Sequence, residues 1–231
     1  MSALGPTPAS PTVGQPLGWQ ARKSASTRLQ IVESTLRCFI DLGYFRTTTA
    51  VIASHAGLSR GAMLHHFPTR ADVVRAAVEH LHTKRLRAFR TAVESLPSGG
   101  NRLHGTLEAY WEQANHPMYA VFLELAVAAR TDPELAAILA PAEAAFEREL
   151  RRTAMELFPE WHALGDNFDL GFDLLLSVMD GCAVSFLKHR DTRPKRRLLR
   201  YLEARLDELA RPPSGRAQTW NRRPDGQDSA G

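Results

Sequence analysis

The sequence predicts an all-α protein of about nine helices. Apolar residues recur at intervals of three and four along most of the chain, the spacing that places them on one face of a helix. Runs in which apolar and polar residues alternate, as in a half-buried strand, do not appear. With 231 residues, of which 44% are hydrophobic, the chain is long enough to form one core or two small ones.

Composition divides the chain into four parts. Residues 1–26 and 212–231 are rich in small and polar residues and lack apolar periodicity, so they bury too little surface to offset the entropy of ordering. We therefore expect a disordered basic arm over 1–26 and a disordered tail over 212–231. Between them we expect a small helical domain over 27–72 and a larger one over 73–211.

Capping residues mark the helices of the N-terminal part. The first helix presents an apolar face over residues 31–42 and is expected to end at Gly43, in a left-handed cap. Thr69 and Asp72 fit the capping box that begins a later helix. That helix carries apolar residues at helical spacing over 74–96, so it is long enough to connect the two domains.

The C-terminal part shows the same signals. Pro117 suits the first turn of one helix, and residues 131–134 suit the start of the next. Pro141 lies inside the apolar pattern of that helix, where a proline predicts a break or a kink. Two apolar helices, over 168–187 and 194–209, complete the predicted fold.

Membrane, metal and disulfide classes are disfavoured. Cys38 and Cys182 lie in apolar helical runs, and we interpret both as buried thiols in a reducing cytoplasm. The chain start lacks the pattern of a secretion signal, and three aspartates interrupt the most apolar segment, residues 168–187, so we expect no membrane span. The histidines at 65–66 and at 80 and 82 diverge on a helix, so we expect no metal site and no cofactor.

Charge is unevenly distributed along the chain. Residues 1–90 hold 12 Lys and Arg against four Asp and Glu, whereas residues 91–210 hold 13 against 19. The formal net charge of the whole chain is only +4. A basic N-terminal module joined to an acidic remainder suggests that the first module binds a polyanion.

The basic excess surrounds two short helices joined by a tight turn. Thr48 or Thr49 can cap the first helix, Gly57 lies in the turn, and Ser59 can cap a second helix with room for only two turns. Two such helices with a glycine in the turn predict a helix-turn-helix, whose second helix enters the major groove of DNA. Phe67 is expected to close the core behind the second helix.

Five short motifs lie in and around this segment. They are Gly43-Tyr44-Phe45-Arg46-Thr47-Thr48-Thr49, Ile52-Ala53, Ala56-Gly57-Leu58-Ser59, Gly61-Ala62 and His66-Phe67-Pro68-Thr69-Arg70. Together they make residues 28–75 similar to the DNA-binding domain of the TetR family of bacterial transcriptional regulators. Two positions depart from the family pattern: Leu64 stands where many members carry a Tyr that contacts the DNA backbone, and Arg70 stands where they carry Lys.

The residue types of this segment suit DNA. Guanidinium groups and hydroxyls bind phosphates, and Arg60 is a candidate for guanine, Ala62 for a thymine methyl and His65 for a base edge or a phosphate. The expected DNA-contacting residues are Arg28, Arg46, Thr48, Thr49, Ser59, Arg60, Gly61, Ala62, Leu64, His65, His66 and Arg70.

Two further features suit close contact with DNA. Gly61 is costly inside a helix, and we infer that it lets the backbone approach the DNA closely. Arg22 and Lys23, on the expected flexible arm, are predicted to add minor-groove or phosphate contacts.

The resemblance also implies a small-molecule pocket in the C-terminal helices and a dimer formed by the last two helices. The expected pocket residues are Tyr110, Trp111, His116, Met118, Tyr119, Phe122, Leu123, Phe172, Leu175 and Met179. The expected dimer contacts are Met179, Cys182, Phe186, Leu198, Leu202, Leu206 and Leu209, with Gly181, Ala183 and Ser185 allowing close helix approach. Ordinary core packing accounts for any one of the apolar pocket residues equally well.

These expectations describe a cytoplasmic, non-enzymatic transcriptional regulator, a repressor by family resemblance. It would bind a palindromic double-stranded DNA operator as a homodimer and respond to an unknown small-molecule effector. Two alternatives stay open. One is a helical small-molecule-binding protein or an enzyme that uses groups such as Glu124, His116 or Asp180, although a nucleophile elbow, a phosphate loop and metal-ligand spacing are lacking. The other is an interaction module whose helix-turn-helix binds protein.

Overall fold

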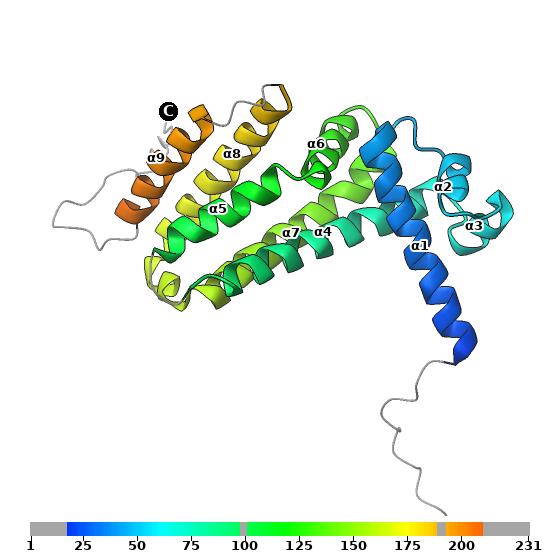
Figure 1. Ribbon diagram of the computed structural model, residues 1–231, viewed down its shortest axis with the longest axis horizontal. Coiled ribbons are helices and arrows are strands. Elements are labelled where there is room, and N and C mark those ends of the chain that lie inside the picture. The colour runs from blue at the N-terminus through cyan, green and yellow to red at the C-terminus, as the bar shows by residue number, and fades with distance from the viewer. Residues whose placement is uncertain (1–17, 98–100, 189–192, 210–231) are drawn as a thin grey trace, which may run out of the picture. The chain divides into compact units, whose positions relative to one another are not determined.

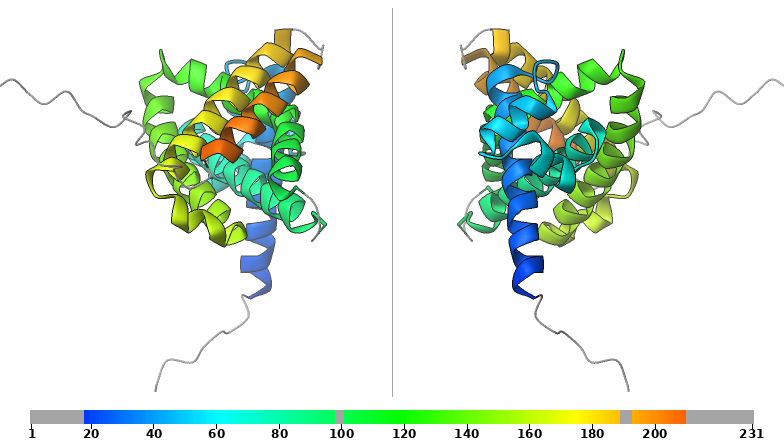
Figure 2. Two further views of the ribbon diagram at one scale, coloured as in Figure 1. Left: turned by 90° about the vertical axis from the view of Figure 1, so that its left-hand side faces the viewer. Right: turned by 90° about the vertical axis from the view of Figure 1, so that its right-hand side faces the viewer.

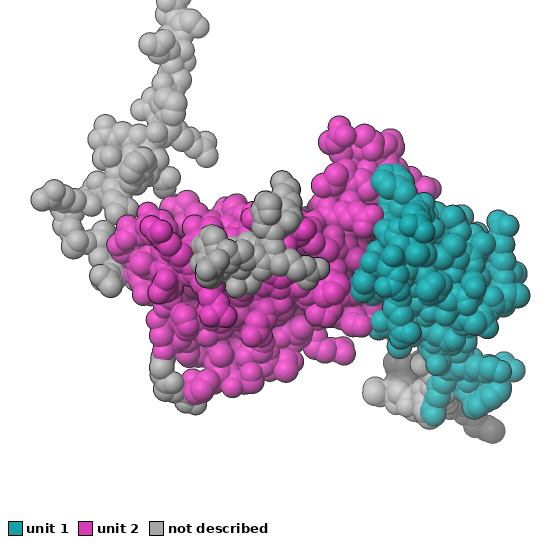
Figure 3. Space-filling model, turned by 45° about the horizontal axis from the view of Figure 1, so that its top comes forward, with its two compact units in different colours: residues 1–77 teal, residues 78–231 magenta. Residues whose placement is uncertain are grey.

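The computed structural model describes residues 18–97, 101–188 and 193–209, in which helices are joined by turns and short loops and no strand is present (Figure 1). Nine α-helices and one 3-10 helix are present among them, which confirms the predicted fold class. The chain divides into two compact units, residues 1–77 and 78–231 (Figure 3). The observed boundary follows residue 77, five residues after the one expected from the sequence, which followed residue 72. Both positions lie inside one helix, Arg70–Glu94, which runs from the first unit into the second.

The first unit contains α1 (Trp19–Leu42), α2 (Thr49–His55), α3 (Arg60–His66) and the first turns of α4 (Arg70–Glu94). Each of these helices contributes buried side chains to one core. The core includes Ile31, Leu36, Phe39, Tyr44, Ile52, Ala53, Met63, Phe67, Val73 and Val74. Helices of seven residues are not stable in isolation, so the positions of α2 and α3 depend on this shared core.

Helix α1 begins earlier than expected. The prediction of a disordered arm is wrong for residues 19–26, which are helical and exposed. Gln, Ala, Arg and Lys favour a helix without burial, and the Lys23 ammonium lies 5.2 Å from the centre of the Trp19 ring, one turn away. Arg22 and Lys23 therefore lie on a helix and not on an extended arm. Residues 1–17 and the tail expected over 212–231 lie outside the described residues.

The end of α1 and the start of α4 follow the capping predictions. Gly43 ends α1 with a positive φ of 82°, but its ψ of 167° is extended and not left-handed helical as expected. This backbone conformation suits glycine, and it turns the chain so that Tyr44 enters the core. At α4 the Thr69 amide donates to the Asp72 carboxylate at 3.0 Å, and the Asp72 amide donates to the Thr69 hydroxyl at 3.1 Å.

The second unit contains the rest of α4 and all later elements. These are α5 (Arg102–Ala114), α6 (Pro117–Ala129), α7 (Pro133–Leu157), the 3-10 helix η1 (Pro159–Leu164), α8 (Asp166–Lys188) and α9 (Arg193–Leu209). Helix α8 packs against α5, α6 and α9, and α6 packs against α7. Figure 2 shows α8 and α9 side by side. Aromatic residues dominate the core, among them Phe89, Tyr110, Trp111, Phe158, Phe168 and Phe172.

The predicted helix starts in this unit are confirmed. Pro117 and Pro133 occupy the first turns of α6 and α7. The His116 ring caps α6 by accepting the Met118 amide at 3.2 Å, and Asp132 caps α7. Of the break or kink expected at Pro141, the break is wrong, because α7 continues to residue 157 and buries residues both before and after the proline.

Candidate nucleic-acid interface and ligand cavity

Two side-chain caps define the helix-turn-helix. The Thr48 hydroxyl accepts the Val51 amide at 3.3 Å, and the Ser59 hydroxyl accepts the Ala62 amide at 3.1 Å. Thr48 is therefore the cap of α2, one of the two positions that the sequence allowed. Between the helices, Gly57 adopts a positive φ of 65°, which forms the tight turn before α3.

Helix α3 buries one side and presents the other to solvent. Met63 is fully buried, and Phe67, directly after the helix, closes the core as predicted. The exposed residues of α3 are Arg60, Gly61, Ala62 and His65, and the half-buried ones are Leu64 and His66. Arg46, Thr48 and Ser59 are exposed around the helix, and Thr49 is half-buried. The N-terminal part of α3 is thus accessible, as a recognition helix requires.

Gly61 has no packing reason to be glycine. A Cβ atom built there meets no atom within 4 Å among the described residues. Glycine nevertheless destabilises a helix interior by about 1 kcal/mol relative to alanine. Packing within the described residues therefore does not account for this cost.

Two of the expected phosphate ligands are engaged inside the first unit. Arg70 donates to the Tyr44 carbonyl at 2.8 Å, to the Tyr44 hydroxyl at 2.8 Å and to the Thr47 carbonyl at 3.1 Å, and its guanidinium lies 4.2 Å from the Tyr44 ring centre. Arg28 donates to the His66 carbonyl and lies 4.2 Å from the Phe67 ring centre. Both guanidinium groups join elements of the helix-turn-helix to each other.

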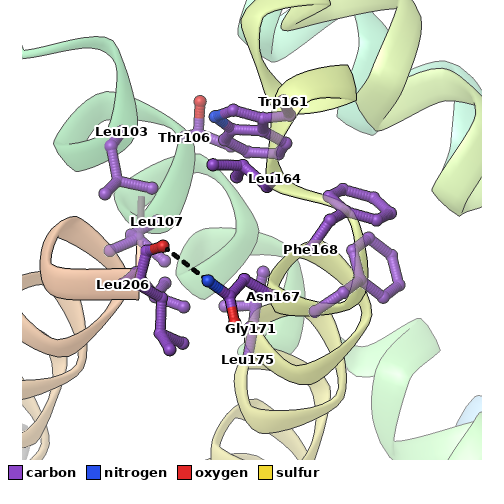
Figure 4. A pocket seen from close by; sticks show the side chains of 12 residues that line it. Leu103, Thr106, Leu107, Trp161, Leu164, Asn167, Phe168, Gly171, Leu175 and Leu206 are labelled. Atoms are coloured by element: carbon purple, nitrogen blue, oxygen red, sulfur yellow. Dashed lines mark hydrogen bonds between the residues drawn. The ribbon is translucent and has the colours of Figure 1, made fainter. Parts of the chain in front are cut away.

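The second unit contains a polar cavity of about 170 Å³ with aromatic walls. It is lined by Arg85, Tyr110, Tyr119, Phe122, Glu143, Phe146, Glu147, Leu150, Leu176 and Asp180. A second cavity, of about 370 Å³, shares Arg85 and Tyr119 with it and extends past His116 and Met118. A third, of about 60 Å³, is almost entirely apolar and lies among α5, η1, α8 and α9 (Figure 4).

Charged groups in the 170 Å³ cavity are incompletely paired. The Arg85 guanidinium lies 4.4–4.7 Å from the ring centres of Tyr119, Phe122 and Phe146, and one terminal nitrogen is buried without a hydrogen-bond partner in the described structure. One carboxylate oxygen of Glu143 is also buried without a hydrogen-bond partner in the described structure. Burial raises the pKa of this carboxyl. The Asp180 carboxylate instead accepts the Tyr119 hydroxyl.

His82 lies behind this cavity and is 6% exposed. Its ring stacks on Phe146 at 4.7 Å between centres, and neither ring nitrogen has a hydrogen-bond partner among the described residues. Burial and, second, the nearby Arg85 charge lower the pKa of His82 from 6.5 to about 4. The imidazole is therefore neutral in the folded protein near pH 7.

This His82 shift predicts a pH-dependent stability. Between pH 6.5 and 4 the unfolded chain binds a proton that the folded chain rejects, so stability is complete above about pH 6.5 and falls as the pH is lowered. The shift is worth about 3 kcal/mol. We expect His82→Phe to lose that part of the pH dependence in denaturant titrations at pH 7 and 4.5. The exposed His55→Phe serves as the control, and equal pH dependence in His82→Phe and the parent would contradict the assignment.

The expected pocket residues are distributed over several places. Tyr110, Tyr119 and Phe122 line the 170 Å³ cavity, His116 and Met118 line the second, and Phe172 and Leu175 line the third. Trp111 and Met179 are buried in the core, and Leu123 packs against it.

Arg85 and Glu143 were missed by the sequence analysis, although the sequence contains a signal for both. Arg85 falls on the apolar stripe of α4 that includes Val78 and Phe89, and Glu143 falls on the stripe of α7 that includes Leu139 and Leu150. A charged residue on a buried stripe is unusual.

Helices α8 and α9 leave an apolar surface exposed, which we call the α8–α9 face. It consists of Leu170, Val184, Leu187, Leu198 and Tyr201, which are 40–62% exposed. Helix α8 is long and apolar enough to cross a membrane by length and composition. Arg151 of α7, however, pairs with both Asp169 and Asp173 on α8, at 2.8 Å for Asp169. Such a helix, with one buried and one exposed apolar side, also suits a contact between two subunits.

Several expected dimer contacts lie inside the unit. Met179, Cys182 and Leu202 are buried in its own core, as is Ala183, so the expectation that they contact a second chain is corrected. Of the remaining four, Leu198 is exposed, and Phe186, Leu206 and Leu209 are half-buried. The close approach of α8 to α9 is at Gly171, where a Cβ atom would lie 3.2 Å from the Leu206 side chain. Gly181 and Ser185 are exposed on α8.

Comparisons with known proteins agree with this architecture. An uncharacterized HTH-type transcriptional regulator of Mycobacterium tuberculosis is 28% identical over 170 residues, which cover 71% of this chain and 85% of that protein. A transcriptional regulator of Pseudomonas aeruginosa has a similar fold, with a TM-score of 0.62 at 20% identity over 80% of this chain and 91% of that one. The multidrug binding protein EbrR, solved with imidazole, has a TM-score of 0.57 at 17% identity over 81% and 97%.

The family comparison concerns the first unit. The family described as bacterial regulatory proteins, tetR family, matches residues 31–77, from the first core residue of α1 to the last residue of the unit. This range includes both capped helices of the helix-turn-helix. Residues 31–77 therefore form the DNA-binding helix-turn-helix domain that characterises the bacterial regulatory proteins of the tetR family.

Proposed function

We propose that this regulator is a cytoplasmic, ligand-responsive repressor that binds a palindromic operator as a homodimer. The observation that carries the proposal is the exposed N-terminal part of α3, which combines Arg60, the unexplained Gly61 and Ala62 on a helix of only two turns. In a helix-turn-helix these positions face base edges in the major groove.

Contacts with DNA divide into two kinds. Arg46, Thr48 and Ser59 are exposed and bind phosphates, which fixes the register of the unit on the duplex. Arg60 reads guanine, and His65 reads a base edge or a phosphate. Arg28 and Arg70 support this surface, because their guanidinium groups pack against the buried rings of Phe67 and Tyr44.

The homodimer uses the α8–α9 face. A single helix-turn-helix reads one half-site, so two units related by a two-fold axis are needed for a palindromic operator. On α8, Leu170, Gly181 and Val184 are 11 and three residues apart, which places them on one side of the helix. On α9, Leu198 and Tyr201 add further exposed apolar side chains. Two copies of this face bury their apolar side chains against each other.

The effector binds in the 170 Å³ cavity of the second unit. Unpaired buried polar atoms of Arg85 and Glu143 mark the cavity as a place where a ligand gains hydrogen bonds. The structural neighbour EbrR is described as a multidrug binding protein, which supports a small-molecule effector here. Arg85 belongs to α4, the helix that begins in the DNA-binding unit. An effector acts only if it binds one state of the protein more tightly than the other.

The experiment that tests the proposal is gel retardation with the full chain and fragments of the DNA upstream of its own gene, at several salt concentrations. We expect sequence-specific retention that falls steeply as salt rises, because phosphate contacts release counterions. Absence of any preference over random competitor DNA at low ionic strength would show that the helix-turn-helix does not read sequence.

Gly61→Ala separates the DNA role of this residue from folding. The open space around Gly61 predicts that alanine stabilises the first unit by about 1 kcal/mol. We expect the same variant to bind the operator about tenfold more weakly, because the added methyl group separates the backbone from the DNA. Thermal denaturation and operator titration measure the two effects. Since the variant is the more stable protein, misfolding does not explain a loss of binding, and unchanged affinity would contradict the proposed close approach.

A further inference from the structure

The buried polar atoms of the 170 Å³ cavity constrain the chemistry of its occupant. One nitrogen of the Arg85 guanidinium is a donor without an acceptor, and one oxygen of Glu143 is an acceptor without a donor, within the described structure. A buried polar group without a partner costs the free energy of its lost hydration. A molecule that offers an acceptor to Arg85 and a donor to Glu143 removes both costs.

The charges around the cavity disfavour an ionic occupant of either sign. An anion would pair with Arg85 but would lie near the carboxylates of Glu143 and Asp180, which both line the cavity. A cation would pair with those carboxylates but would lie near the Arg85 guanidinium, which already covers three aromatic rings. Glu147, the remaining lining carboxylate, is paired with Arg151 at 2.9 Å. His82 is neutral near pH 7, so it supplies no charge.

The walls of the cavity define the shape of the occupant. Tyr110, Tyr119, Phe122 and Phe146 line the cavity, and Arg85 lies against one side of the last three. The occupant therefore meets aromatic side chains around the guanidinium, which favours a flat apolar body. The volume of about 170 Å³ is below the roughly 300–1,000 Å³ of sites for drug-sized ligands, so a single-ring molecule fits.

We infer that the effector is a small, uncharged, flat molecule that carries both a hydrogen-bond acceptor and a donor, and that Arg85 and Glu143 bind these two groups. The inference rests on the proposed ligand-responsive function, which it makes specific. Arg85 connects the site to regulation, because it lies on α4, which continues into the DNA-binding unit. A ligand that binds the unpartnered terminal nitrogen of Arg85 fixes a side chain of α4, the helix that begins in the DNA-binding unit.

Three ring compounds of one shape test the inference. Benzamide is uncharged and carries an acceptor and a donor, benzoate is an anion with acceptors only, and benzamidine is a cation with donors only. Because burial raises the pKa of Glu143, binding to the full chain is measured by calorimetry at about pH 8, where the carboxylate form of Glu143 is more populated than at neutral pH. We expect benzamide to bind, and each ion to bind about tenfold more weakly, since each leaves one buried group unpaired.

Two variants test the roles of the individual residues. Glu143→Gln removes the carboxylate charge at constant size, and we expect it to improve benzoate relative to benzamide by about tenfold. Arg85→Met removes the cation, and we expect it to improve benzamidine relative to benzamide. A purely structural role of either residue would weaken all three compounds alike. Arg87→Met and Glu134→Gln, exposed positions on the same two helices, are the matched controls and should keep the parent order.

The outcomes separate this inference from the proposed function. Binding of none of the three compounds, a preference for either ion, or an unchanged order in Glu143→Gln overturns the inference. If Arg85→Met does not fold, the inference is judged on Glu143→Gln alone, from the order of its affinities for the three compounds. Operator retention is measured on the same preparations without any compound, so failure of the DNA-binding function appears there and does not depend on the ligand series.

Discussion

Replacing Arg70 with Ala is expected to destabilise the first unit by about 3 kcal/mol, because three hydrogen bonds from a charged donor and a ring contact are lost together. The Tyr44 and Thr47 acceptors lie on residues that are at most 2% exposed, so water replaces the lost donors poorly. A domain is typically stable by only 5–15 kcal/mol. Denaturant unfolding followed by far-ultraviolet circular dichroism measures the loss.

Arg70→Lys is the informative companion. Lysine keeps the charge but loses the planar fork and the stacking of the guanidinium, so we expect an intermediate stability. If Arg70 were instead a phosphate ligand, as predicted from the sequence, the alanine variant would keep its stability, lose operator affinity for all sequences alike and show a smaller salt dependence. Unchanged unfolding of Arg70→Ala would therefore contradict the structural role.

Placing charges on the α8–α9 face is expected to separate the dimer. In Val184→Asp/Tyr201→Asp, each substitution occurs twice across a two-fold interface, so four buried charges oppose association. We expect a folded monomer in light scattering. Operator affinity should fall by about 100-fold or more, toward non-specific binding, because each monomer reads only one half-site.

The control for this experiment is Val127→Asp, which changes an apolar residue of α6 that is 71% exposed and lies outside the α8–α9 face. It should remain a dimer. Leu202→Asp, in contrast, is expected to unfold the second unit, because Leu202 is 2% exposed in the core. A dimer that persists in the double variant would place the interface on another surface.

Local signals in the sequence were sufficient for the helix-turn-helix. The caps at Thr48 and Ser59, the turn at Gly57 and the box at Thr69 and Asp72 each involve residues within a few positions of each other. Such interactions depend little on the rest of the fold, so residue type and spacing predict them.

Roles that depend on distant partners were not predictable in the same way. The Arg70 acceptors lie 23 and 26 residues away, so the sequence shows a basic residue but not the internal site that it occupies. The leucines of α9 illustrate a second limit. Helical spacing identifies an apolar helix, but Leu199 and Leu202 face the core while Leu198 and Tyr201 face solvent, and only the packed helices determine which stripe is buried.

The early start of α1 has a consequence for how its basic residues meet a duplex. A helix with its side chains is about 10–12 Å wide, whereas the minor groove of B-form DNA is about 6 Å wide. Arg22 and Lys23, both on that helix, therefore cannot follow the floor of the groove as an extended strand does. They meet a duplex through their side chains alone, and contacts of those side chains with phosphates add attraction to any duplex, whatever its sequence.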